Sequence, residues 1–279
     1  MNILRHPVIS VLAATLAFAA VVHADAAPKK GWTGSVSEEQ FKAMHELKTG
    51  AVPELHGTMI DLAGGKAYLS LPANAKPPLP AVVVIQEWWG LNDNIKHWAD
   101  RVAAEGYAAL AVDLYDGKVA TTPDKAMEYM KAADPARCKD IMLAAHAFLA
   151  NDKRVLAAKR GSLGWCFGGG QSLQLAIAAA DLDACVMYYG FPDMDPKKLA
   201  AIKAPILGVF GNQDQSITPA TVDEFDKALT TARVSHEFLK YEAPHAFANP
   251  SNPHYDEKSA GDAWTHVQAF FAAKLKTTK

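Results

Sequence analysis

A cysteine in the stretch "GWCFG" occupies a position from which a side chain could attack a substrate. Gly164 and Gly168 flank Cys166 in the pattern Gly-x-Cys-x-Gly, after an apolar run and before a segment with helical spacing. Such glycines let a chain turn sharply from a strand into a helix, which presents the central side chain at the helix N-terminus. The positive end of the helix dipole favours a thiolate there. We therefore predict a nucleophile, against the alternative of a buried, inert cysteine.

A cysteine nucleophile needs a base, and the base needs a carboxylate that orients it. In folds with this kind of turn, the acid and then the histidine follow the nucleophile along the chain. Asp214 follows the apolar run "PILGVF", and His245 lies in "YEAPHAFANP". We predict that both act with Cys166. The alternatives are that Asp214 caps a helix, that Asp226 is the acid, or that His254 is the base.

The loop "QEWWGLND" after an earlier apolar run supplies further candidates. The backbone N–H groups of Trp88 and Phe167 are predicted to bind an oxyanion. Glu87 directly follows the apolar run, and a buried carboxylate beside a thiol could hold or take its proton. The alternative for Glu87 is an ion pair with Lys or Arg. Trp89 is expected to contribute to an apolar substrate pocket.

The elements that must position these residues alternate along the chain. Buried strands are predicted at 81–86, 107–112, 161–165, 184–189 and 205–210. Helices are predicted near 93–105, 124–133, 138–150, 169–180, 219–231 and 256–275. The stretches 55–61 and 66–72 predict an antiparallel hairpin at the sheet edge. This order indicates one α/β domain over 55–279, with a mostly parallel sheet covered by helices on both faces.

The N-terminus has the character of a secretory signal peptide over residues 1–24. A short basic region precedes an apolar run and a small-x-small cleavage site. We expect cleavage after Ala24, a periplasmic or secreted protein and no membrane attachment after cleavage; the alternative is an uncleaved anchor. Residues 25–54 are expected to form an extension with a short helix after Ser37, to which we assign no function.

The charge and the motifs of the chain limit the classes of molecule that it is expected to bind. The 279 residues carry a net charge of −2, so there is no broad basic field for nucleic acid and a small-molecule substrate is expected. Neither metal-site spacings nor a phosphate-binding glycine loop occur, so no metal and no cofactor are expected. We expect a monomer. An exported protein tolerates disulfides, and Cys138 and Cys185 could form one while Cys166 stays reduced.

The motifs "QEWWGLN", "VDLYDG", "GWCFGGG", "GNQDQSITP" and "PHAF", in this order, resemble the dienelactone hydrolase family of α/β hydrolases, over about residues 55–275. The resemblance implies the α/β-hydrolase fold and a Cys166–His245–Asp214 triad. It also implies that Glu87 holds the resting thiol and accepts its proton when substrate binds. The reaction implied is thiolate attack on a lactone or small activated ester, followed by hydrolysis of a thioester.

The chain also departs from the family pattern. Ala246 and Asn249 stand where family members that act on dienelactone have a serine and an arginine for the substrate carboxylate. Lys125 with Tyr129 corresponds to a second arginine and a tyrosine, and we expect both to contact substrate; the alternative is ordinary helix surface. Two other functions stay open: a broader carboxylesterase or thioesterase with an apolar pocket, and a non-catalytic binding or redox-sensing protein.

Overall fold

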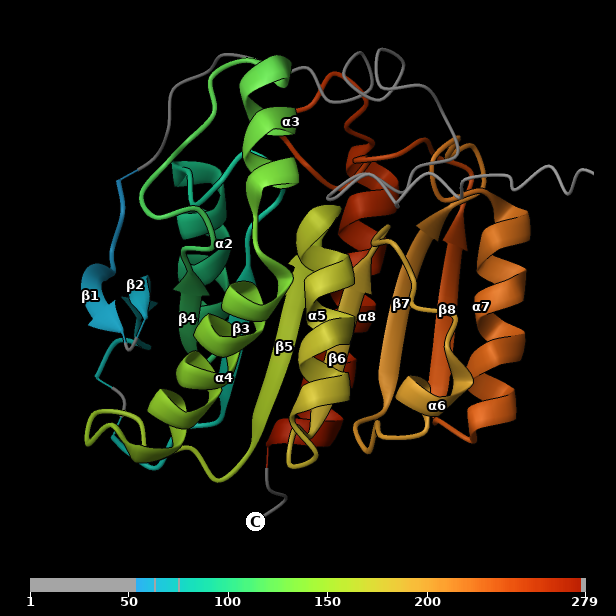
Figure 1. Ribbon diagram of the computed structural model, residues 1–279. Helices are drawn as coiled ribbons and strands as arrows, with labels where there is room; N and C mark the ends of the chain where they lie inside the picture. Colours follow the sequence, from blue (N-terminus) through green and yellow to red (C-terminus); the bar gives the residue numbers. More distant parts are fainter. Residues whose placement is uncertain (1–53, 63, 75, 277–279) are drawn as a thin grey trace, which may run out of the picture.

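One sheet of eight strands runs through the centre of the molecule, with helices on both sides (Figure 1). The computed structural model describes residues 54–62, 64–74 and 76–276. The predicted leader, the extension up to residue 53 and the helix after Ser37 lie outside the described residues. Within the described ranges, none of the helices has the length and apolar character needed to cross a bilayer.

The strands lie in the spatial order β1 (Thr58–Leu62), β2 (Gly65–Ser70), β4 (Ala108–Val112), β3 (Ala81–Ile85), β5 (Arg160–Trp165), β6 (Ala184–Tyr188), β7 (Ile206–Gly211) and β8 (His236–Tyr241). β1 pairs with β2, and β2 with β4, in antiparallel fashion, while the other neighbours are parallel. The edge hairpin and the mostly parallel sheet are therefore confirmed.

The helices are α2 (Asp93–Ala104), α3 (Pro123–Ala132), α4 (Pro135–Asn151), α5 (Phe167–Ala178), α6 (Pro196–Leu199), α7 (Pro219–Ala232) and α8 (Glu257–Leu275). α4 and α5 cover one face of the sheet, and α2 and α8 cover the other (Figure 1). Trp98 of α2 packs against Trp264 of α8, with ring centroids 5.2 Å apart. Every residue of β3, β4 and β6 is buried, because helices cover both faces.

β8 and the four-residue helix α6 are absent from the elements predicted above. β8 lies at the sheet edge and keeps its residues half-buried or exposed, so its sequence "HEFLKY" has no continuous apolar run. A pattern search for buried strands cannot detect such an edge strand. Its place matters for function, because it directs the chain from Tyr241 back toward the carboxyl ends of the central strands, where His245 follows.

One described helix begins differently from the rest. α2, α3, α4, α6, α7 and α8 each start at an Asn, Asp or Thr whose side chain accepts a hydrogen bond from a first-turn backbone N–H. α5 starts at Cys166 instead. The amide groups at this helix terminus therefore face a thiol rather than an oxygen-bearing cap.

Candidate active site

The turn between β5 and α5 holds Cys166 in an unusual backbone conformation, with φ +53° and ψ −119°. A Cβ atom on Gly164 would collide with the carbonyl oxygen of Gly168, and one on Gly168 would collide with that of Gln86. Both positions therefore require glycine. The backbone dihedral angles of Cys166 cost a residue with a side chain about 1–3 kcal/mol. The packing around the turn holds Cys166 in this strained conformation, at the point where its thiol is presented.

The thiol lies below the surface, and Cys166 is only 2% exposed. Burial raises the pKa of Cys166 well above its usual range, and Glu87 would raise it further whenever its carboxyl group is ionised. The backbone N–H groups of Phe167 and Trp88 both donate hydrogen bonds to the sulfur, which acts in the opposite direction. The two N–H groups predicted from the sequence thus converge on one point, which the sulfur occupies.

Glu87 lies two residues beyond the end of β3 and is 3% exposed. Burial raises its pKa to about 8, and the hydrogen bond from Asn249 only partly opposes that shift. The Nδ2 group of Asn249 donates to Oε2 of Glu87 at 2.6 Å, while its Oδ1 accepts from Nδ2 of Asn94 at 3.2 Å and from the Ser251 N–H at 2.8 Å. No described Lys or Arg forms an ion pair with Glu87, so at neutral pH it is a protonated, uncharged acid.

His245 and Asp214 form a fully buried pair, with Nδ1 of the imidazole 2.5 Å from Oδ2 of the carboxylate. The other carboxylate oxygen accepts the backbone N–H groups of Ser216 at 2.7 Å and Ile217 at 2.9 Å. Because a carboxylate can only accept, Nδ1 carries the proton and Nε2 is the basic nitrogen. Of the two acids considered, the structure brings Asp214 to His245.

A tyrosine that the sequence reasoning missed lies against this pair. The ring of Tyr189 packs on His245, with centroids 4.9 Å apart, and its hydroxyl is buried. Burial raises the pKa of Tyr189 well above its usual range, and ionisation of Glu87 or Cys166 would raise it further. Its position directly after β6, at the carboxyl edge of the sheet, was the only available signal.

A cavity of about 350 Å³ opens beside the thiol. α3, α5 and the loop after β6 form its wall, which consists of Met130, Cys166, Phe167, Gly170, Gln171, Gln174, Phe191, Pro192, Asp193 and Met194. The cavity gives a small molecule access to Cys166 at the carboxyl edge of the sheet, where ligands of open α/β sheets bind.

Other predicted site residues lie elsewhere. Lys125 is exposed and pairs with Glu128 on its own helix, at 2.7 Å between Nζ and Oε2. Tyr129 packs on Tyr115, with centroids 6.2 Å apart, and neither Lys125 nor Tyr129 lines the cavity beside Cys166. Trp89 is buried against Trp88 and is not part of the wall either. Substrate contacts by these residues stay predictions.

The two alternative triad members have other partners. Asp226 of α7 contacts Nε2 of His236 on the edge strand β8, at 3.0 Å. His254 uses its backbone N–H to bind Oδ1 of Asn252 at 2.8 Å. All three cysteines are buried and none is in a disulfide. In the part of the chain that the structure describes, no group of three His, Cys, Asp or Glu side chains could hold a metal.

Comparison with known proteins finds similarity to one family of hydrolases. A model of the dienelactone hydrolase family matches residues 66–275. A Methylorubrum extorquens protein described as "Putative carboxymethylenebutenolidase" is 33% identical over 220 residues, or 74% of this chain and 75% of its own length. Protein usf of Aquifex pyrophilus is 35% identical over 205 residues, or 70% of this chain and 89% of its own.

Solved structures share the architecture. A dienelactone hydrolase-like promiscuous phosphotriesterase from metagenomic libraries superposes with a TM-score of 0.70 at 26% identity, covering 80% of this chain and 99% of that one. Dienelactone hydrolases have the α/β-hydrolase fold, so the fold class expected from the sequence is confirmed.

Proposed function

This chain belongs to the dienelactone hydrolase family and is a carboxylic ester hydrolase, and from this premise we propose that Cys166, His245 and Asp214 form its catalytic triad. The substrate is a lactone or a small activated ester, and the intermediate is a thioester on Cys166. The single observation that carries the proposal is the fully buried His245–Asp214 pair, because its only basic nitrogen is Nε2.

The resting enzyme keeps its nucleophile protonated. The pKa of Cys166 is raised by burial, so the thiol is neutral until substrate enters. The substrate carbonyl oxygen then takes the place of the sulfur at the N–H groups of Trp88 and Phe167, and the sulfur turns toward the carbonyl carbon. A thiol that ionises only in the presence of substrate resists oxidation, which suits an exported protein.

The thiol proton needs an acceptor at this moment. At neutral pH Glu87 holds its own proton, since its pKa is about 8, so we assign this step to Nε2 of His245. Above that pKa an ionised Glu87 can accept the proton instead, as the family resemblance implies. In both cases a neutral Glu87 beside the sulfur lowers the cost of forming the thiolate, because two adjacent anions repel.

The chemical steps then balance. A bond forms between sulfur and the carbonyl carbon, the bond from that carbon to the leaving oxygen breaks, and the thiol proton reaches the leaving oxygen through His245. In the second half, Nε2 removes a proton from water, and the hydroxide attacks the thioester carbon. The carbon–sulfur bond breaks, and the proton returns to the thiolate.

Turnover of p-nitrophenyl acetate and of dienelactone by wild type and Cys166→Ala tests the triad. We expect no measurable turnover in the variant, and an acyl adduct on wild type, located at Cys166 by mass spectrometry after rapid quenching. Iodoacetamide should abolish wild-type turnover. Near-full activity of Cys166→Ala would contradict covalent catalysis. A folded wild type that turns over neither ester would instead favour the binding or redox-sensing function.

We also propose that the protein acts outside the cytoplasm, on the basis of its predicted leader. N-terminal sequencing of protein recovered from the periplasm or the medium should begin at Asp25. Recovery of the full-length chain from the cytoplasmic fraction alone would contradict this.

A further inference from the structure

The cavity beside Cys166 has walls that suit an uncharged molecule. Its side chains are mainly apolar, from Met130, Phe167, Phe191, Pro192 and Met194. Gln171 and Gln174 are its neutral polar members, and no Lys or Arg is among the lining residues. A substrate carboxylate that enters this cavity loses its hydration and finds no cation to replace it.

The one ionised side chain of the wall is an acid. Oδ2 of Asp193 accepts hydrogen bonds from Nζ of Lys198 at 2.9 Å and from Nε2 of Gln174 at 3.3 Å, and Oδ1 accepts the Asp195 N–H at 2.9 Å. Burial acts to raise the pKa of Asp193, but these bonds outweigh it and hold the pKa below its usual value. Lys198 is therefore engaged in neutralising Asp193, and the wall offers no net positive charge.

Two groups near the sulfur, the protonated Glu87 and the amide of Asn249, are uncharged as well. Glu87 and Asn249 contact each other through a hydrogen bond of 2.6 Å, and both are buried. The amide oxygen of Asn249 accepts from Asn94 and Ser251, which fixes the orientation of the amide. The NH₂ group is thus turned to Glu87, and a neutral donor takes the place that a cation would need for binding an acidic substrate.

Three cations on or near α3 have other partners or line a different cavity. Lys125 pairs with Glu128 at the surface. Lys118 and Arg137 line a separate cavity of about 110 Å³, together with Tyr129. There Arg137 pairs with Asp116, and Nζ of Lys118 lies 5.6 Å from the ring centre of Tyr129.

We propose that this enzyme selects uncharged esters or lactones with an apolar group beside the scissile bond, and discriminates against those with a carboxylate there. This inference rests on the proposed function and specifies its substrate class. Met130, Phe191 and Met194 contact the apolar group, and the missing cation excludes the acid.

The test compares dienelactone with its carboxyl methyl ester, which differ by one negative charge while the lactone ring stays the same. Ring opening is followed by ultraviolet absorbance, with the spontaneous rate subtracted. We expect kcat/KM for the methyl ester to exceed that for the free acid by about tenfold or more, because the buried carboxylate has no partner. Equal values, or a preference for the acid, would overturn the proposal.

Two variants of one wall residue sharpen the test. Gln171→Lys adds a cation to the wall, and Gln171→Met is its uncharged control of similar length. We expect the lysine variant to reduce the preference for the methyl ester at least about threefold relative to the methionine variant, since a cation now compensates the carboxylate. The same preference for the methyl ester over the free acid in both variants would contradict the proposal that this wall contacts the group beside the scissile bond.

The variant Lys125→Ala tests whether Lys125 supplies a positive charge to the substrate carboxylate. We expect the ratio of the two kcat/KM values to stay as in wild type, and a selective loss with the free acid would show that Lys125 binds the carboxylate and would overturn the proposal. A wrong assignment of the triad would give a different result from a wrong assignment of selectivity, because Cys166→Ala would then keep its activity toward both substrates.

Discussion

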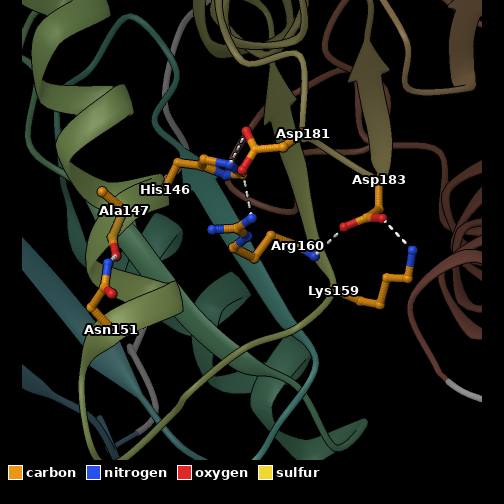
Figure 2. Close-up of polar contacts among 7 residues, drawn as sticks. All are labelled: His146, Ala147, Asn151, Lys159, Arg160, Asp181 and Asp183. Carbon is orange, nitrogen blue, oxygen red and sulfur yellow. Dashed lines mark hydrogen bonds and ion pairs between the residues drawn. The ribbon is translucent and has the colours of Figure 1, made fainter.

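Among the described residues, two buried histidines contact aspartates, at opposite edges of the sheet. His245 and Asp214 lie at the carboxyl edge, and both side chains are completely buried. His146 of α4 lies at the amino edge, where its Nε2 is 3.0 Å from Oδ1 of Asp181 (Figure 2). His146 is also buried, but the side chain of Asp181 is 67% exposed. The same residue types thus occur in two different environments.

The partners of each aspartate make the difference. Besides His245, Asp214 accepts the neutral backbone N–H groups of Ser216 and Ile217. Asp181 is shared with Arg160, whose Nη2 donates to Oδ2 at 2.7 Å (Figure 2). Arg160 extends this network to Asp183, which accepts hydrogen bonds from the Arg160 backbone N–H at 2.9 Å and from Nζ of Lys159 at 2.6 Å. The first environment suits the catalytic base proposed above, because the carboxylate holds the Nδ1 proton of His245 and leaves Nε2 basic. The second is a charged network that connects α4 with the amino ends of β5 and β6.

The largest expected effect is on turnover. In Asp214→Asn the new Oδ1 still accepts the Ser216 and Ile217 N–H groups, but the NH₂ group faces Nδ1 of His245. This moves the imidazole proton to Nε2 and removes the base, so we expect kcat/KM to fall by about 10⁴-fold. The matched control Asp181→Asn should change kcat/KM less than about twofold. A comparable loss in both variants would mean that the two pairs do not differ in function.

The next largest effect is expected on the pH dependence of stability at the carboxyl edge. The pKa of Glu87 is raised from 4.5 to about 8 by burial, so the folded state retains a proton that the unfolded state releases. Its contribution to stability is fully present below pH 4.5 and is lost as the pH rises to about 8. We expect Glu87→Gln, relative to wild type, to gain a few kcal/mol between pH 5 and 8. Urea unfolding at several pH values measures the difference in unfolding free energy between the variant and wild type. A difference that does not change with pH would contradict a raised pKa of Glu87 in the folded state.

The amino edge should respond to pH with the opposite sign. Burial, and then the charge of Arg160, lower the pKa of His146. Its contribution to stability is therefore present above the ordinary histidine pKa of 6.5 and is lost as the pH falls through its lowered value in the folded state. His146→Gln should be about 1 kcal/mol less stable at pH 7.5, because a buried hydrogen bond is lost.

Unfolding of His146→Gln at pH 5 provides the check. The deficit should shrink there, because glutamine does not titrate, and kcat/KM should equal that of wild type at both pH values. A deficit that grows on acidification would contradict a neutral His146 in the folded state.

The smallest effect is expected at the periphery of the network. Lys159 is 46% exposed and pairs with Asp183, so Lys159→Gln should cost no more than about 0.5 kcal/mol. The difference should decrease in high salt, because ions screen an exposed pair. Urea unfolding with and without 1 M NaCl measures it. A salt-independent loss would mean that Lys159 contributes through packing rather than charge.

The sequence was enough to predict the order of the buried strands and the longer helices, and the positions of Cys166, Asp214, His245 and Glu87 among them, but not β8 or α6. Strands buried on both faces need continuous apolar runs, and a sharp turn needs glycine, so both leave local signals. Residues that directly follow such runs gather at one edge of a parallel sheet, which is why a candidate site could be predicted from their places alone.

Which side chains meet, and which of them carry charge, became visible in the folded structure alone. Asn249 contacts Glu87 across 162 residues of chain, and no local pattern encodes that pairing. Lys125 contacts Glu128 one helical turn away, and its expected contact with substrate stays a prediction. Tyr189 and the His146 network left no motif. The physical reason is that contact and ionisation depend on burial and on neighbours brought from distant elements, which appear only when the sheet and its helices pack together.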